Sequence, residues 1–129
     1  MFWKSRWRSI RTAWQGLIFT LQTEPNARIH GAVAGLVLIL AGLFKVARWE
    51  WALILVMIGL VWSAELFNTA LEVLVDYVSP EQKEFAKVCK DVSAAGVLIT
   101  VLTAVAVGVV IFLPPLWAWL LAVGKLLSH

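Results

Sequence analysis

Charged residues are scarce in this chain. Asp, Glu, Lys and Arg make up 15% of its 129 residues, against about 25% in an ordinary soluble domain. Hydrophobic residues make up 61%, and the mean hydropathy is +0.86. This composition excludes a disordered chain and argues against a soluble helical bundle. We therefore predict one integral-membrane domain covering residues 1–129.

The chain also lacks a pair of cysteines, the common nucleotide-binding motifs and a basic patch for nucleic acid. The single cysteine, Cys89, cannot form an internal disulfide and has no CxxC neighbour. Neither GxxxxGK[ST] nor GxGxxG occurs, so any nucleotide site must be built from helix side chains. The net charge is +3, but the basic residues flank apolar segments and form no patch with stacking aromatics. This distribution favours a role in membrane topology and predicts no nucleic-acid partner.

The apolar segments predict an all-α membrane protein with an N-terminal amphipathic surface helix and three transmembrane helices. Residues 1–24 combine basic residues with tryptophans, which is typical of a helix in the lipid headgroup region. The transmembrane helices are expected at residues 29–47, 51–75 and 92–113.

Two proline sites bear on where these helices begin and end. Ser79, Pro80 and Gln82 predict a short helix before the third span, with Ser79 as its N-cap. The pair Pro114-Pro115 is expected to end that span. Residues 114–129 would then form an interfacial tail.

Lysine and arginine are unevenly distributed between the two sides of the predicted membrane domain. One side carries eight of them, at positions 4, 6, 8, 11, 28, 83, 87 and 90. The other side carries three, at positions 45, 48 and 125. The positive-inside rule therefore predicts a cytoplasmic N-terminus and a cytoplasmic loop at residues 76–91.

Four polar residues interrupt the second predicted span. Glu65, Asn68, Glu72 and Asp76 recur on one stripe of a helix that turns about 100° per residue. Glu65 lies about 21 Å along the helix from Trp51, past the midplane of a ~30 Å hydrocarbon core. A carboxylate inside a bilayer costs about 2.5–3.5 kcal/mol or more. The stripe therefore implies a metal ion, a proton or a partner cation.

These positions suggest phosphoryl transfer. Mg²⁺ on a nucleotide prefers one or two protein carboxylates, which Glu24 and Glu72 could supply. Lys83, Lys90 and the N-terminal arginines are candidates for positive charge near the phosphates. Glu65, the most deeply placed carboxylate, suits a general base for a lipid hydroxyl at headgroup depth.

The run from Glu65 to Asp76, the polar loop and Lys90-Asp91 followed by small residues resemble the prokaryotic diacylglycerol kinase and undecaprenol kinase family. The similarity extends from about Arg8 through Pro114. The resemblance implies a homotrimer in the bacterial inner or plasma membrane that transfers the γ-phosphate of MgATP to a lipid alcohol. Its active sites would lie between protomers at the cytoplasmic interface.

The resemblance also implies roles for individual residues. Glu65 takes the general-base position, and Glu24 and Glu72 take the metal-binding positions. The expected nucleotide-binding residues are Glu24, Asn68, Glu72, Asp76, Glu81, Gln82, Lys83, Lys90 and Asp91. The expected lipid-substrate contacts are Arg8, Glu65 and Ala94.

The lipid acceptor and two rival functions stay open at this point. Ser5 replaces an arginine, and His30 a carboxylate, of the family's diacylglycerol-specific Gram-negative members. Residues 26–30 and 111–114 look more like the undecaprenol kinase branch, so undecaprenol is the expected acceptor and diacylglycerol the alternative. A small proton-coupled multidrug transporter would need a carboxylate in the first span and a fourth span. A non-catalytic scaffold would use the polar stripe only for helix association.

Overall fold

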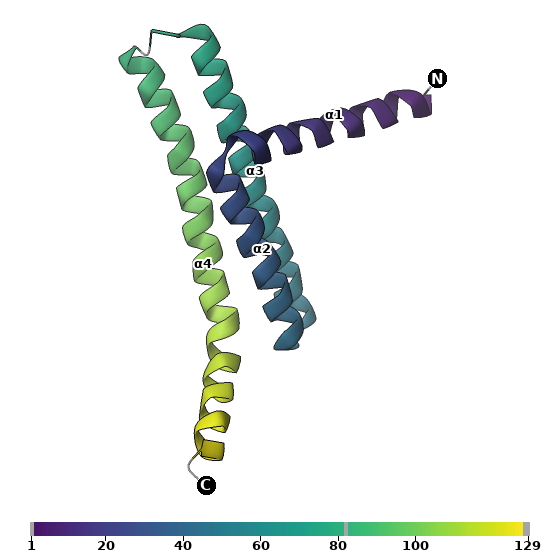
Figure 1. Ribbon diagram of the computed structural model, residues 1–129, viewed down its shortest axis with the longest axis vertical. Coiled ribbons are helices and arrows are strands. Elements are labelled where there is room, and N and C mark those ends of the chain that lie inside the picture. The colour runs from purple at the N-terminus through teal and green to yellow at the C-terminus, as the bar shows by residue number, and fades with distance from the viewer. Residues whose placement is uncertain (1, 82, 128–129) are drawn as a thin grey trace.

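The computed structural model describes the backbone of residues 2–81 and 83–127 and the side chains of residues 6–81 and 83–126. The described chain forms four helices and no strand: α1 (Phe2–Thr23), α2 (Pro25–Leu43), α3 (Arg48–Val78) and α4 (Glu84–Leu127). α2, α3 and α4 lie side by side, and α1 projects from them at a steep angle (Figure 1). The predicted all-α fold class is confirmed.

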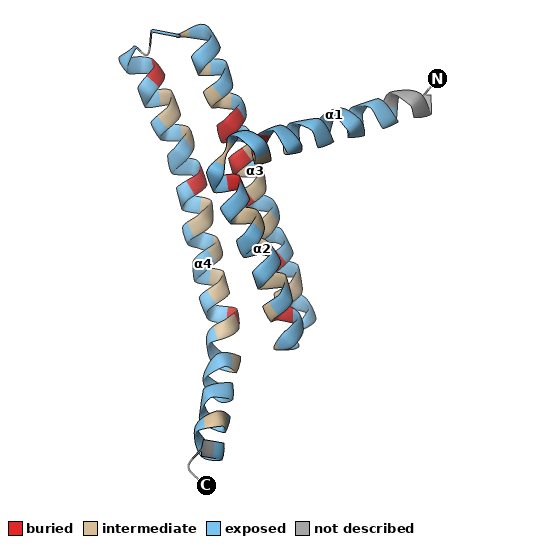
Figure 2. Cartoon of the chain, viewed as in Figure 1, coloured by how far each residue is buried: buried red, intermediate tan, exposed pale blue. Residues whose placement is uncertain are grey.

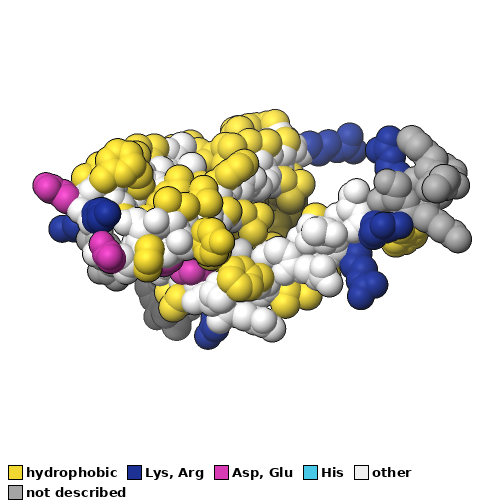
Figure 3. Space-filling view, turned by 90° about the horizontal axis from the view of Figure 1, so that it is seen from above, with side chains coloured by type: hydrophobic (Ala, Val, Ile, Leu, Met, Phe, Trp, Pro, Cys, Tyr) yellow, Lys and Arg dark blue, Asp and Glu magenta, His cyan; other side chains and the backbone are white. Residues whose placement is uncertain are grey.

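Three of these helices, α2, α3 and α4, are long and apolar enough to cross a membrane. Few described residues are buried, and they lie where helices face one another (Figure 2). Large aliphatic side chains on all three helices face outward instead. Hydrophobic side chains also cover much of the bundle viewed from above, whereas Lys and Arg mark the projecting arm (Figure 3). This surface suits contact with lipid.

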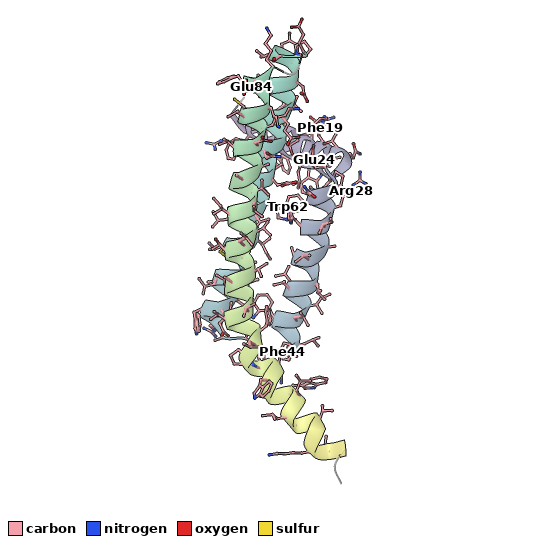
Figure 4. The ribbon with its side chains drawn as sticks, turned by 90° about the vertical axis from the view of Figure 1, so that its left-hand side faces the viewer. Phe19, Glu24, Arg28, Phe44, Trp62 and Glu84 are labelled. Atoms are coloured by element: carbon pink, nitrogen blue, oxygen red, sulfur yellow. The ribbon has the colours of Figure 1, made fainter. Side chains whose placement is uncertain are left out.

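A sharp elbow joins α1 to α2. Glu24 has extended backbone angles (φ −102°, ψ 114°), and Pro25 begins α2, where a missing N–H is tolerated. The Arg28 guanidinium reaches back across the elbow (Figure 4). Its Nε donates to the Leu21 carbonyl at 2.8 Å and its Nη2 to the Gln22 carbonyl at 2.6 Å. Arg28 thereby satisfies carbonyls that the end of α1 leaves without partners.

The turn from α2 to α3 is a Schellman motif. The Val46 N–H donates to the Ala41 carbonyl at 3.2 Å and the Lys45 N–H to the Gly42 carbonyl at 3.3 Å. Lys45 occupies the left-handed position of the motif with φ 52°. Next along the chain, the Glu50 carboxylate accepts the Ala47 N–H at 2.6 Å and so begins α3.

The apolar core lies at this same end of the bundle. Ala41, Ile54 and Ile111 bring one buried residue each from α2, α3 and α4. Beside them the rings of Phe44 and Phe112 meet with centroids 6.3 Å apart. The core therefore closes the end of the bundle opposite the polar half of α3.

The start of α4 differs from the prediction. Ser79 is the C-cap of α3, and its N–H donates to the Val75 carbonyl at 2.8 Å. Pro80 and Glu81 form a turn, and α4 begins at Glu84. The predicted helix with Ser79 as N-cap is therefore wrong, because the Ser-Pro pair closes one helix instead of opening the next. Gln82, its expected capping partner, lies outside the described residues.

The end of α4 also differs. The helix continues through Pro114 and Pro115 to Leu127, so the prediction that it ends at this pair is wrong. Proline fixes φ near its helical value and costs a helix one N–H donor, which favours a bend when apolar helix continues on both sides. The C-terminal part of α4 runs in a new direction (Figure 4). The interfacial placement of residues 114–129 stays a prediction.

The left-handed residue in the α2–α3 turn leads to a first test. We expect Lys45→Gly to stabilise the fold by about 1 kcal/mol, because glycine adopts this conformation without a Cβ clash. Thermal unfolding in detergent measures the effect. Lys45→Ala removes the same charge but keeps the Cβ, so it should give no such gain. Equal midpoints for the two variants would contradict the account.

Candidate active site

The polar half of α3 contains three of the four buried polar residues among those that the structure describes, the fourth being Thr20 of α1. Glu65 is 2% exposed, Asn68 8% and Thr69 3%. The Thr69 hydroxyl donates to the Glu65 carbonyl at 2.9 Å, so its own helix satisfies it. The Glu65 carboxylate and the Asn68 amide instead point away from the helix backbone and are the groups available for chemistry.

The Asn68 amide links α3 to α4. Its Nδ2 donates to the Glu72 carboxylate at 2.9 Å, and its Oδ1 accepts from the Ser93 hydroxyl at 2.6 Å. Because an ionised carboxylate can only accept, the amide nitrogen must face Glu72, and this fixes the orientation of Asn68. The Ser93 hydroxyl also lies 2.9 Å from the Lys90 carbonyl, but its single hydrogen serves one acceptor at a time. The network holds the Glu72 carboxylate in place.

A second cross-link lies two turns further along α3. The Lys90 ammonium contacts the Asp76 carboxylate at 2.5 Å, with side-chain exposures of 31% and 57%. At that exposure an ion pair contributes little to stability. Its effect is to keep a cation and a carboxylate beside each other near the polar network.

Two residues of the α1–α2 region approach Glu65. The His30 Nε2 lies 3.9 Å from the Glu65 carboxylate, and both side chains are largely shielded from solvent. Glu24, half-buried at the elbow, and Glu72 both act electrostatically on Glu65. Glu24 at the elbow and Glu65 and Glu72 on α3 therefore place their charges in one region.

These acidic groups fit a nucleotide-bound magnesium ion. Among the described residues, no three His, Cys, Asp or Glu side chains form a ready-made metal cluster. Mg²⁺ in nucleotide sites takes one or two carboxylates and completes its shell with phosphate oxygens and water. The oxygen-only carboxylates of Glu24 and Glu72, with Asn68 supporting one of them, match that requirement.

Other predicted site residues are exposed in the single chain. Glu81 and Lys83 are exposed and pair with each other at 3.9 Å, and Asp91 is exposed on α4. Arg8 is exposed on the projecting part of α1, about 24 Å along the chain from Glu24 at helical rise. Ala94 is exposed on α4. A single chain therefore brings together Glu24, Glu65, Asn68 and Glu72, with the Asp76–Lys90 pair further along α3. The roles of all these residues stay predictions.

Two contributors were not predicted as site residues. The sequence analysis used Arg28 only in the charge count and His30 only as a difference from the family's diacylglycerol-specific members. The structure uses Arg28 to fix the elbow beside Glu24 and brings His30 to Glu65. Both residues lie within six positions of Glu24 in the sequence, which could have marked them as candidates. Whether they reach the site, however, depends on how α2 packs against α3.

The helices and the buried acidic group define a membrane protein with a polar site near one end of its bundle. Comparison with known proteins agrees with this class. A model of the family described as prokaryotic diacylglycerol kinase matches residues 11–112. The chain belongs to this family and is a lipid kinase.

Individual relatives cover most of the chain. It is 37% identical over 109 residues to an undecaprenol kinase of Bacillus subtilis, covering 84% of this chain and 89% of that protein. It is 38% identical over 109 residues to a diacylglycerol kinase of Synechocystis, covering 84% of this chain and 62% of that protein. A diacylglycerol kinase of Escherichia coli K12 is 29% identical over 99 residues, covering 77% and 75%.

The amide network generates a second test. Asn68→Asp keeps the shape of the side chain but replaces the amide donor with an oxygen facing the Glu72 carboxylate, so the two groups repel when ionised and must take up a proton to form a hydrogen bond. We expect it to destabilise the fold by about 1–3 kcal/mol in magnesium-free detergent, measured by thermal unfolding.

Asp76→Asn is the matched control, because it breaks an exposed ion pair on the same helix and should cost about 1 kcal/mol or less. A smaller loss for Asn68→Asp than for Asp76→Asn would show that the buried network does not hold α3 and α4 together.

Proposed function

We propose that this lipid kinase transfers the γ-phosphate of MgATP to undecaprenol at the cytoplasmic face of a bacterial inner or plasma membrane. The observation that carries the proposal is the buried carboxylate of Glu65 beside Glu24 and Glu72, with Asn68 holding Glu72 in place. Buried acids of this kind need a cation and suit a reaction that removes a proton.

Glu65 acts on the lipid alcohol. Its carboxylate accepts the hydroxyl proton while the alcohol oxygen forms a bond to the γ-phosphorus. The bond from that phosphorus to the bridging β-oxygen breaks, and ADP leaves. His30, 3.9 Å from Glu65, borders the place where the alcohol oxygen must lie.

Glu24 and Glu72 hold the magnesium ion in this proposal. When bound, Mg²⁺ neutralises charge on the β- and γ-phosphate oxygens. Asn68 keeps the Glu72 carboxylate directed toward the ion, and the Asp76–Lys90 pair keeps a cation beside the phosphates. Glu81, Gln82, Lys83 and Asp91 are proposed to contact the nucleotide, and Arg8 and Ala94 the lipid.

The proposed assembly is a homotrimer with sites between protomers. Within one chain Glu81, Lys83 and Asp91 are exposed, and Glu81 pairs with Lys83. A neighbouring protomer could bring such residues to the site, which would complete the nucleotide contacts. The excess of Lys and Arg on one side of the helices supports a cytoplasmic site.

Undecaprenol is favoured over diacylglycerol as the acceptor. The undecaprenol kinase of Bacillus subtilis aligns over 89% of its own length, against 62% for the equally similar Synechocystis diacylglycerol kinase. Purified protein with MgATP and each lipid tests this directly by the rate of phosphorylated product. Faster turnover of diacylglycerol than of undecaprenol would contradict the proposed acceptor.

The general-base role gives a third prediction. Glu65→Gln preserves the size of the side chain but cannot accept the proton, so kcat should fall about 100-fold or more. The oligomer should elute unchanged from a sizing column. Glu84→Gln, an exposed change in the first turn of α4, serves as control and should leave kcat unaltered. Retention of more than a few per cent of the activity in Glu65→Gln would remove Glu65 from this role.

The metal-binding role gives a fourth. Glu72→Gln and Glu24→Gln should each raise the Mg²⁺ concentration for half-maximal activity, by about tenfold. A titration of activity against Mg²⁺ at saturating ATP measures the shift. An unchanged magnesium dependence in both variants would contradict the assignment.

A further inference from the structure

An apolar cavity of about 180 Å³ lies between α2, α3 and α4. It is partly open to the surface, because Val33 and Val105 in its lining are exposed. Its apolar walls offer a water molecule no hydrogen-bond partners. Of its described lining side chains, only His30 and Trp62 carry a nitrogen, and the others are aliphatic, Met57 or Phe112. Such a space suits a hydrocarbon ligand.

One end of the cavity reaches the proposed active site. His30 lines it, and the same side chain lies 3.9 Å from the Glu65 carboxylate. Trp62, one turn from Glu65 on α3, lies between α2 and α3 (Figure 4). Its ring comes within 3.3 Å of where a Cβ of Gly31 would lie, so any larger residue at that position would push against the ring. A chain entering past Trp62 would start beside the general base.

The other end of the cavity borders the apolar core. Ile54 and Phe112 line it and also belong to the apolar core or pack against it. The ring of Phe112 is in turn backed by Phe44. The cavity therefore has one end beside a polar site and one apolar end.

A single face of α3 makes this arrangement. Ile54, Ile58 and Val61 line the cavity, and Glu65 and Glu72 follow at the same helical spacing. This face of α3 thus changes from apolar to acidic between Val61 and Glu65. A lipid alcohol bound along it would place its hydrocarbon chain beside the apolar residues and its hydroxyl beside Glu65.

We propose that this cavity receives the first part of the acceptor's hydrocarbon chain and thereby selects a polyprenol. The inference rests on the proposed function and names the feature that sets its acceptor class. A polyprenol carries its hydroxyl directly on a hydrocarbon chain, which matches the apolar walls below Glu65. The ester groups that follow the hydroxyl of diacylglycerol would be buried there with few polar partners, which costs free energy.

Position-dependent filling of the cavity tests the proposal. Gly108 lines the cavity near its apolar end, and a side chain added to it meets no atom within 4 Å at its Cβ. It lies about 18 Å below Glu65, counted along α4 from Ser93 and along α3 from Asn68. Ala34 lines the cavity one turn from His30. Gly108→Leu should therefore obstruct only long chains, whereas Ala34→Leu should obstruct short ones as well.

The measurement is kcat/KM of the full-length protein in detergent with geraniol, farnesol and undecaprenol as acceptors. Geraniol is also tested as a competitive inhibitor of undecaprenol phosphorylation. Gly108→Leu should lower kcat/KM for undecaprenol about tenfold or more and leave geraniol within about twofold. Ala34→Leu should lower the values for all three alcohols. Gly35→Leu is the matched control, since Gly35 is exposed beside Ala34 with open space at its Cβ, and it should change none.

Equal losses for all three alcohols in Gly108→Leu, or no loss, would overturn the cavity assignment. If Gly108→Leu does not accumulate, Ala104→Leu, one turn nearer the site and also lining the cavity, replaces it with the same expected dependence on chain length. If the unaltered protein phosphorylates diacylglycerol but no prenol, the proposed acceptor fails and the cavity assignment with it. If it phosphorylates undecaprenol and no variant depends on chain length, only the cavity assignment fails.

Discussion

A carboxylate held almost out of solvent inside an apolar helix is expensive, and Glu65 is held so with two further carboxylates acting on it. His30 nearby and the Asn68 amide on Glu72 offset part of the repulsion among these groups. The rest calls for a cation, which nucleotide-bound magnesium would supply in this account. Binding of MgATP would therefore recover free energy that the three carboxylates cost in its absence.

The elbow before α2 and the helices α2, α3 and α4 all bring residues to this site, and each contribution has a local cause. Pro25 and Arg28 set the elbow that brings Glu24 to the end of α2. The antiparallel pairing of α3 and α4 places Ser93 against Asn68 and Lys90 against Asp76. The Phe44–Phe112 contact and the core beside it close the opposite end. Rigid apolar packing at one end thus supports polar chemistry at the other.

Much of this was predictable from the sequence, and the reasons for the rest are physical. Long apolar runs and the spacing from Glu65 to Asp76 predicted the helices and placed the polar stripe on one face, because both depend on local periodicity. The approach of His30 to Glu65 could not be predicted, since it depends on how α2 rotates against α3. Ser79-Pro80 and Pro114-Pro115 misled because proline suits a turn, a helix start or a bend, and the neighbouring helices decide which. The roles of the individual site residues stay predictions.

Binding of a paramagnetic cation tests the central claim most directly. Mn²⁺ can replace Mg²⁺ and be followed by electron paramagnetic resonance during titration of the protein with a non-hydrolysable ATP analogue. The account predicts Mn²⁺ binding that requires the analogue and is lost when Glu24 and Glu72 are both changed to Gln. Undiminished binding in that double variant would show that the acidic groups beside Glu65 gather for some other reason.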